Sequence, residues 1–359
     1  MSRIFVAGLG AVSPAGWNVA ALREALDKGQ PLPVQTVARP GWEKPLPAHR
    51  VPNPPVRPEF LAHPRLRRSS PITHYVAAAA LEAVARLRTH CAAENFRLGM
   101  VACLQSGCVQ YSCRFYDETL KDPSTASPLV FPETVYAAPV SHVAALLENV
   151  LLACSLVGDA SAFLSGTALG VQWLEEDRVD ACLVIGAEET HWIMADALRH
   201  LDRESIIAAG AGALCLCRKP EWSAGIELAA ITDAHNYSAQ NTRRQAAQSM
   251  REQLGKYSSE ELLCDGLGNS RRLDEAERAA WSDWTGPRIS PKRILGEGMM
   301  AAAAWQCVAA GDALASGRFA AANVSLVGAN QQALGARFVR TDSGISHLSA
   351  DRSAGNIRP

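Results

Sequence analysis

Cys154 is the residue whose type best suits covalent chemistry, because a cysteine thiolate is a strong nucleophile that can take an acyl group. It lies inside the apolar run from Val150 to Val157, a pattern typical of a buried strand. A thiol in the middle of a buried strand is a poor source of thiolate. We therefore predict that Cys154 packs in the core, and a nucleophilic role for it is the alternative.

Two serines lie near the start of the helix expected after this strand. Ser161 and Ser165 carry hydroxyl groups that a neighbouring base could activate. Capping of the helix by Ser161 or Asp159 is the simpler interpretation, since both residue types accept hydrogen bonds from the first N–H groups of a helix.

Metal and cofactor sites are not indicated by the spacing of the residues. The nine histidines form no HxxxH or HExxH pair, and the ten cysteines show no CxxC pair of the kind found in zinc sites. Gly8 and Gly10 do not open a GxGxxG motif, because Ser13 holds the place of the third glycine. We expect neither a metal ion nor a bound cofactor, and we interpret the cysteines as reduced core residues.

The composition describes a globular chain without a strong charge. Of its 359 residues 48% are hydrophobic, and 35 basic residues face 36 acidic ones, so a surface for nucleic acid is not expected. The opening MSRIFVAGLG lacks the pattern of a signal peptide, and no apolar run reaches the length of about 18 residues that spans a membrane. We predict a soluble, cytoplasmic protein without membrane insertion.

Apolar strands and amphipathic helices must position these residues. The periodicity predicts strands at 4–8, 98–104, 150–157, 179–186 and 323–328, and helices at 19–26, 72–87, 141–147, 159–176 and 299–314. Residues 31–64 are rich in proline and predict a long surface loop. The alternation of strands and helices indicates the α/β class, with mostly parallel central strands layered with helices.

The chain is predicted to have two similar halves. A glycine turn, a helix and a strand follow one another after Gly158, and the same order recurs after Gly296 and Gly298. We place the join at LCLCRKPEWS, where a buried strand passes into a charged turn. The predicted division is 1–220 for the N-terminal half, 221–342 for the C-terminal half and 343–359 for a polar tail.

Several segments resemble the β-ketoacyl-acyl-carrier-protein synthases, whose fold is the thiolase fold. They occur in the order of that family and span nearly the whole chain: FVAGLGAVSPAGWNVAALREALDKGQ, SPLVFPETVYAAPVSHVA, QWLEEDRVDACLVIGAEE, AAGAGALCLCR, SPKRILGEGMMAAAAWQ and VGANQQALGARFVR. The resemblance implies a thiolase-like fold with two similar halves.

The resemblance also implies that the catalytic residues have been lost. In an active synthase a cysteine at a helix N-terminus takes the acyl chain, two histidines assist decarboxylation of the malonyl unit, and a lysine and a glutamate support the site. The nucleophile position falls on Ala160 here, and the histidine positions fall on Asp265 and Glu297. Lys292 is retained, while the supporting glutamate becomes Gln306.

A synthase without these residues is similar to a chain-length factor, the non-catalytic partner of an active ketosynthase. The resemblance implies a heterodimer that shapes the acyl tunnel and meets an acyl carrier protein through the complex, in polyketide, aryl polyene or fatty-acid-like biosynthesis. The shortened chain looks most like the factors of bacterial aryl polyene pathways. By family position, the residues expected at the partner interface and the tunnel are Phe131, Thr134, Val135, Tyr136, Pro139 and His142.

Two other functions stay open from the sequence. One is an active 3-oxoacyl-carrier-protein synthase that condenses acyl and malonyl units with Cys154 as nucleophile, since ACSL is similar to the nucleophile segment of the family. The other is a scaffold or binding protein of the same fold without acyl chemistry. The resemblance favours a subunit with no catalytic activity of its own.

Overall fold

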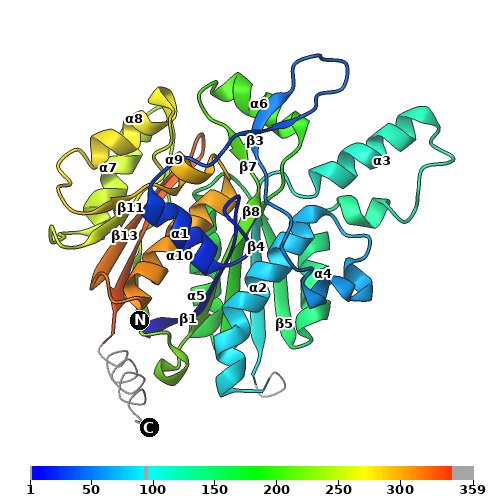
Figure 1. The fold of residues 1–359 in the computed structure, drawn as a ribbon. Coiled ribbons are helices and arrows are strands. Elements are labelled where there is room, and N and C mark those ends of the chain that lie inside the picture. Colours follow the sequence, from blue (N-terminus) through cyan, green and yellow to red (C-terminus); the bar gives the residue numbers. More distant parts are fainter. Residues whose placement is uncertain (1, 93–95, 342–359) are drawn as a thin grey trace, which may run out of the picture.

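One large mixed sheet organises the chain, and helices lie on both of its faces (Figure 1). The computed structural model describes residues 2–92 and 96–341. The eleven strands of this sheet follow the order β12-β11-β13-β14-β9-β1-β8-β6-β4-β5, with β10 beside β14. Within the described ranges no helix is both long and apolar enough to cross a lipid bilayer.

Five strands of the sheet come from the N-terminal part of the chain. They are β1 (Ile4–Val12), β4 (Leu98–Leu104), β5 (Val150–Val157), β6 (Ala181–Glu188) and β8 (Gly210–Cys217). β4 and β5 have the bounds that the apolar runs predict. β4 pairs in parallel with β5 and β6, whereas β8 pairs antiparallel with β6 and β1.

The C-terminal part repeats this arrangement. Its strands are β9 (Ile226–Ile231), β11 (Leu262–Cys264), β12 (Arg288–Ile289), β13 (Ala321–Val327) and β14 (Gln332–Arg340), with the short β10 (His235–Asn236). β11 pairs in parallel with β12 and β13, and β14 pairs antiparallel with β13 and β9. Parallel pairing thus lies at both ends of the sheet, and antiparallel pairing of β1 with β9 joins the two parts.

These two parts confirm the predicted α/β class. The predicted boundary between residues 220 and 221 falls in the short helix η5 (Pro220–Trp222), which connects β8 to β9. The division into halves at that residue stays a prediction, and the predicted tail 343–359 lies outside the described residues.

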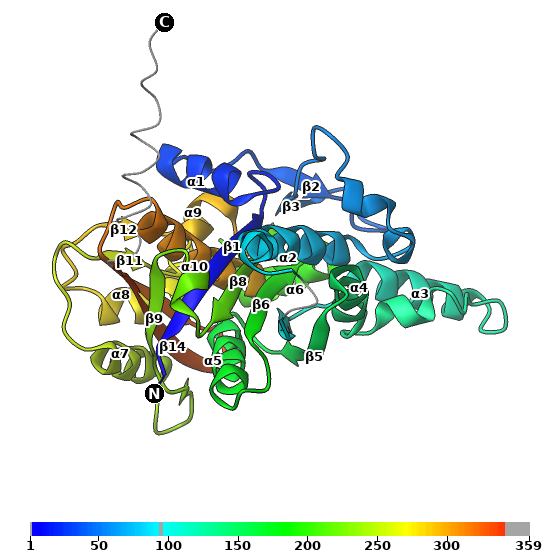
Figure 2. The ribbon, with the colours of Figure 1, turned by 90° about the horizontal axis from the view of Figure 1, so that it is seen from below.

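The helices form layers around the sheet (Figure 2). α5 (Ala162–Glu175) and α10 (Met300–Ala315) pack between the two parts of the sheet and against each other, while α2 (Pro71–His90) covers β1, β8 and β6 from outside. On the other outer side α7 (Arg243–Leu254) packs on β14 and on α8 (Arg271–Ala280). The remaining helices are α1 (Val19–Lys28), α3 (Val109–Lys121), α4 (Ala138–Leu147), α6 (Trp192–Leu201), α9 (Pro291–Leu295), η1 (Glu59–Ala62), η2 (Pro64–Leu66) and η4 (Phe131–Thr134).

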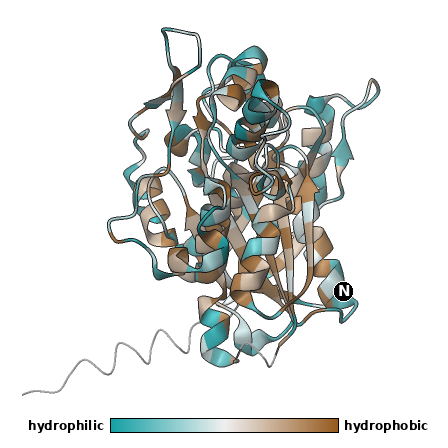
Figure 3. Cartoon of the chain, turned by 90° about the vertical axis from the view of Figure 1, so that its right-hand side faces the viewer, coloured by the Kyte–Doolittle hydropathy of each residue, from teal (hydrophilic) through white to brown (hydrophobic). Residues whose placement is uncertain are grey.

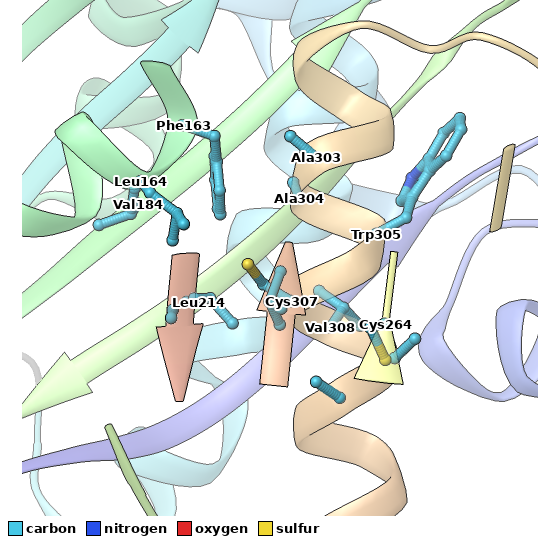
Figure 4. Packing of buried hydrophobic residues seen from close by; sticks show 14 of the residues in the cluster. Phe163, Leu164, Val184, Leu214, Cys264, Ala303, Ala304, Trp305, Cys307 and Val308 are labelled. Atoms are coloured by element: carbon cyan, nitrogen blue, oxygen red, sulfur yellow. The ribbon is translucent and has the colours of Figure 1, made fainter. Parts of the chain in front are cut away.

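The alanine-rich α10 is the centre of the core (Figure 4). Its small side chains let two sheet strands approach closely: a Cβ atom at Gly186 would lie 2.3 Å from the carbonyl oxygen of Met300, and one at Gly212 would lie 2.7 Å from the Cβ of Ala304. Trp305 fixes the helix in place, since its indole N–H donates to the carbonyl oxygens of Val12 and Ala211, each at 3.0 Å. The start of α10 also approaches the turn before α5, since a Cβ atom at Gly158 would lie 3.8 Å from Met300 Cε.

The structure contains several elements that the periodicity did not predict, among them α3, α6, α7 and α8, and one predicted loop contains strands. The loop predicted at 31–64 contains β2 (Gln35–Val37) and β3 (Leu46–His49), which form a small sheet with β7 (Ile207–Ala208). α3 was not predicted, because Val109 is its one buried residue and it therefore lacks an apolar stripe of core width. Figures 1 and 2 show α3 projecting from the body of the molecule.

Candidate functional site

The start of α5 is the point at which a nucleophile would be expected. β5 ends at Val157, Gly158 and Asp159 turn the chain, and Ala160 and Ser161 precede the first helical residue. The partial positive charge of a helix N-terminus would lower the pKa of a thiol placed there. The side chain at this point is the methyl group of half-buried Ala160, which cannot be acylated.

Ala160 lines a small cavity of about 60 Å³ that opens to solvent. The cavity lies between the start of α5, the loop after β11, the loop after β13, and the residues that connect α9 to α10. Its lining residues are Gln105, Asp159, Ala160, Leu198, Leu201, Ser205, Arg243, Gly266, Gly268, Ser270, Leu273, Asp274, Lys292, Glu297, Met299, Val327 and Ala329. Among these described residues there is no cysteine and no histidine, so the cavity offers neither a thiol nor an imidazole base.

Lys292 and Glu297 form an ion pair in the cavity wall. Lys292 Nζ lies 2.7 Å from Glu297 Oε2, and the other carboxylate oxygen accepts the N–H of Met299 at 2.8 Å. Burial lowers the pKa of Lys292, but the charge of Glu297 and its hydrogen bond outweigh this, so the net shift is upward. The lysine is therefore held as a cation by a carboxylate at the position that the family resemblance gives to a histidine.

Asp265 is fully buried and does not belong to the described residues that line the cavity. Its Oδ2 lies 2.9 Å from Arg288 Nη1, and its Oδ1 accepts the hydroxyl of Ser290 at 2.6 Å. Burial raises the pKa of Asp265, while the hydrogen bond from Ser290 and the charge of Arg288 act in the opposite direction. The Asp265 carboxylate, at the other position that the family resemblance gives to a histidine, is therefore an ion-pair partner of Arg288.

Cys154 lies on the core side of β5, opposite Val101 of β4, and packs against the central core. Cys154 is in a strand as predicted, but β5 is an edge strand without a fully buried residue, and Cys154 itself is half-buried. Burial raises the pKa of the Cys154 thiol, and no histidine contact is found for it among the described residues. Cys154 does not line the cavity, so any reaction of its thiol would take place outside the cavity that Ala160 lines.

The residues predicted at the partner interface lie on and beside η4. Phe131, Val135 and Tyr136 are exposed, whereas Thr134 is half-buried. Two members on α4 face inward: Pro139 is buried, and half-buried His142 has its Nε2 2.9 Å from both carboxylate oxygens of Glu133. Their role in partner contact stays a prediction.

Sequence reasoning missed the buried glutamate that holds the cavity loop. Glu188, the last residue of β6, accepts the backbone N–H of Gln105 at 2.6 Å and that of Ser106 at 3.1 Å, together with the Ser106 hydroxyl. Burial raises the pKa of Glu188 to about 7, against the lowering effect of these hydrogen bonds. Two consecutive glutamates at the end of an apolar strand were the signal that could have identified it.

Glu188→Gln is expected to change the pH dependence of stability. Because the folded pKa lies above the ordinary value of 4.5, the contribution of Glu188 is fully present below that value and is lost as pH rises through about 7. The native chain should therefore lose up to about 3 kcal/mol relative to the variant between about pH 5 and about pH 8. Urea unfolding at both pH values measures this difference, with the exposed Glu59→Gln as control. Parallel pH curves for the native chain and Glu188→Gln would contradict it.

The fold matches solved structures over almost the whole chain. The ishigamide ketosynthase/chain length factor structure has 17% sequence identity and a TM-score of 0.79 over 94% of this chain and 99% of that chain. A ketosynthase in complex with its chain length factor from Xenorhabdus doucetiae has 14% identity and a TM-score of 0.74, covering 95% of this chain and 98% of that chain. A beta-ketoacyl synthase from Burkholderia phymatum has 15% identity and a TM-score of 0.76, covering 95% and 100%.

No protein-family model matches the chain, and no curated protein matches its sequence. The structural likeness nevertheless establishes the fold, which is the thiolase-like fold of the ketosynthases. The resemblance found in the sequence is therefore confirmed at the level of the fold.

Proposed function

We propose that this chain is a non-catalytic, chain-length-factor-like subunit that pairs with an active β-ketoacyl-acyl-carrier-protein synthase. The observation that carries the proposal is the cavity at the start of α5, where the methyl of Ala160 stands in the nucleophile position and neither thiol nor imidazole is present among the described lining residues. Acyl transfer and decarboxylation need groups that this cavity lacks.

A partner subunit is supported by the exposed apolar surface around β5. β5 is the last strand of the sheet, and an unpaired apolar edge of this kind favours pairing with another chain. Figure 3 gives the hydropathy of the chain from this side of the molecule. Five of the large exposed apolar residues lie on β5 or between residues 131 and 136, where the Tyr136 carbonyl accepts the hydroxyl of Ser155 on β5: Phe131, Val135, Tyr136, Leu151 and Val157.

The proposed role in the complex is consistent with this arrangement. Two of the similar structures are described as a ketosynthase with a chain length factor. A subunit of the same fold that docks through β5 and η4 would bring Phe131, Val135 and Tyr136 to the interface, where side-chain bulk limits the length of an acyl chain. We place the pair in cytoplasmic polyketide, aryl polyene or fatty-acid-like synthesis, with the acyl carrier protein meeting the complex.

Intact-mass spectrometry tests the proposal. The chain is purified alone and with a co-expressed ketosynthase encoded beside it, and each sample is incubated with an acyl-carrier-protein thioester. We expect the two chains to co-purify in equal amounts and only the partner to gain acyl mass. An acyl adduct on Cys154 would make this chain an enzyme, and failure of the two co-expressed chains to co-purify would favour a scaffold without acyl chemistry.

A further inference from the structure

Asp159 places a carboxylate directly before α5, beside Ala160. The side chain is buried, and its Oδ1 accepts the hydroxyl of Ser161 at 2.6 Å and the N–H of Ser161 at 3.3 Å. Its Oδ2 accepts the backbone N–H groups of Asn330 and Gln331 at 3.2 and 3.1 Å. Neutral donors from two distant segments therefore surround one anion.

The loop that supplies two of these donors is built to approach the carboxylate closely. A Cβ atom at Gly328 would lie 2.3 Å from Asp159 Oδ2, so no other residue fits there without movement. The loop is held from its other side by Arg243, whose Nε donates to the carbonyl oxygen of Gly328 at 2.8 Å. Tyr237 donates from its hydroxyl to the same oxygen at 3.0 Å and to that of Gln332 at 2.7 Å.

No arginine or lysine lies within ion-pair distance of Asp159 in the described part of the chain, so the helix terminus and the backbone amides are what stabilise its charge. Together these donors hold the carboxylate of the residue that directly precedes position 160. The Asp159 carboxylate itself therefore takes up these hydrogen-bond donors.

We propose that Asp159 acts as a built-in anion, and that it prevents an acyl thioester from reacting at position 160 whatever residue stands there. This inference rests on the proposed function, and it gives a second reason, besides the missing nucleophile, why position 160 does not react. The chain would then have lost both the attacking group and the place where a negatively charged oxygen could be stabilised.

The blocked step is acyl transfer to a thiol. The sulfur at position 160 would attack the thioester carbonyl carbon, the bond to the departing sulfur would break, and the proton of the attacking thiol would end on the departing thiol. Negative charge develops on the carbonyl oxygen during this exchange and needs N–H donors nearby. Asp159 uses these donors for its own oxygens and repels a second negative charge.

The first test adds a thiol with and without this carboxylate. Ala160→Cys and the double variant Asp159→Ala/Ala160→Cys are each co-expressed with a ketosynthase whose nucleophilic cysteine is replaced by alanine, and acyl gain from an octanoyl N-acetylcysteamine thioester is followed by mass spectrometry. We expect the double variant to react about 100-fold faster than Ala160→Cys. Equal rates would overturn the proposal. Ala160→Cys/Glu297→Gln is the matched control, and an equal gain from it would also overturn the proposal, since it would show a general charge effect.

The second test uses only this chain, so its failure is separable from a failure of pairing. Asp159→Ala leaves a small space lined by N–H donors, and about 100 mM acetate should raise its Tm by about 2 °C more than it raises that of the native chain. Chloride at the same concentration serves as the reference salt. A variant that acetate does not stabilise, or that stays insoluble in both salts, would overturn the proposal.

Discussion

Replacing Arg288 with alanine is expected to lower the free energy of unfolding by about 3 kcal/mol. Arg288 is the one cation within ion-pair distance of Asp265 in the described residues, and that carboxylate is fully buried. Removal of the guanidinium leaves an uncompensated charge in the core. The expected value is at the lower end of the usual range because the Arg288 side chain is 27% exposed. Urea unfolding followed by tryptophan fluorescence measures it.

Two comparisons separate the ion pair from a general loss of a side chain. Arg293→Ala removes an exposed arginine with one long hydrogen bond, to the carbonyl oxygen of Gly268 at 3.4 Å, and should change stability by less than about 0.5 kcal/mol. Adding Asp265→Asn to Arg288→Ala should restore part of the loss, because the amide carries no charge.

The effect of Arg288→Ala should also depend on pH. The pKa of Asp265 is raised by burial even with Arg288 present, and loss of the cation raises it further. Protonation of the carboxyl group at low pH therefore reduces the cost of the substitution. A loss below about 1 kcal/mol at neutral pH, or one that grows as pH falls, would contradict the role assigned to this ion pair.

Leu151→Arg is expected to weaken the complex with the co-expressed ketosynthase by about 30-fold or more. Leu151 lies at the bulge near the start of β5, where the pairing with β4 skips it, and is 60% exposed, so the substitution should leave the fold of this chain intact. An arginine there places an unpaired charge in the proposed interface, where desolvation makes it costly. Quantitative co-purification and size-exclusion chromatography of the pair measure the effect.

Val34→Arg is the matched control for this prediction. Val34 is 51% exposed, and its segment is bonded to α9 through the N–H of Leu32 and the carbonyl oxygen of Ile294, away from β5. It should co-purify with the partner as the native chain does. Equal recovery of partner with Leu151→Arg would rule out β5 as the contact, and weaker recovery with both variants would indicate a general loss of folded protein.

Much of the fold could be predicted because secondary structure leaves a local periodic signal. Leu98–Leu104 and Val150–Val157 are continuous apolar runs, and both are strands with the predicted bounds. α3 was missed because a helix that projects from the body buries too few residues to show a stripe of apolar side chains in its sequence. The short β2 and β3 were missed because three- and four-residue strands have no measurable period.

The residue types at the positions that the family resemblance gives to catalysis can be read from the chain directly: a methyl at 160, carboxylates at 265 and 297, and a lysine at 292. The sequence by itself could not determine what those side chains contact. Lys292 forms an ion pair with Glu297, five residues further along the chain. Asp265 instead pairs with Arg288 of β12, and Asp159 accepts a hydrogen bond from the N–H of Asn330, 171 residues away.

These pairings become visible only in the folded chain, as does the place of β5 at the edge of the sheet with exposed Leu151 and Val157. Hydrophobic periodicity shows only whether a residue faces the interior, and it is a local signal that extends over about a dozen neighbouring residues. Ion pairs, backbone donors and sheet order depend on the packing of segments that lie far apart in the chain, which the local pattern does not encode.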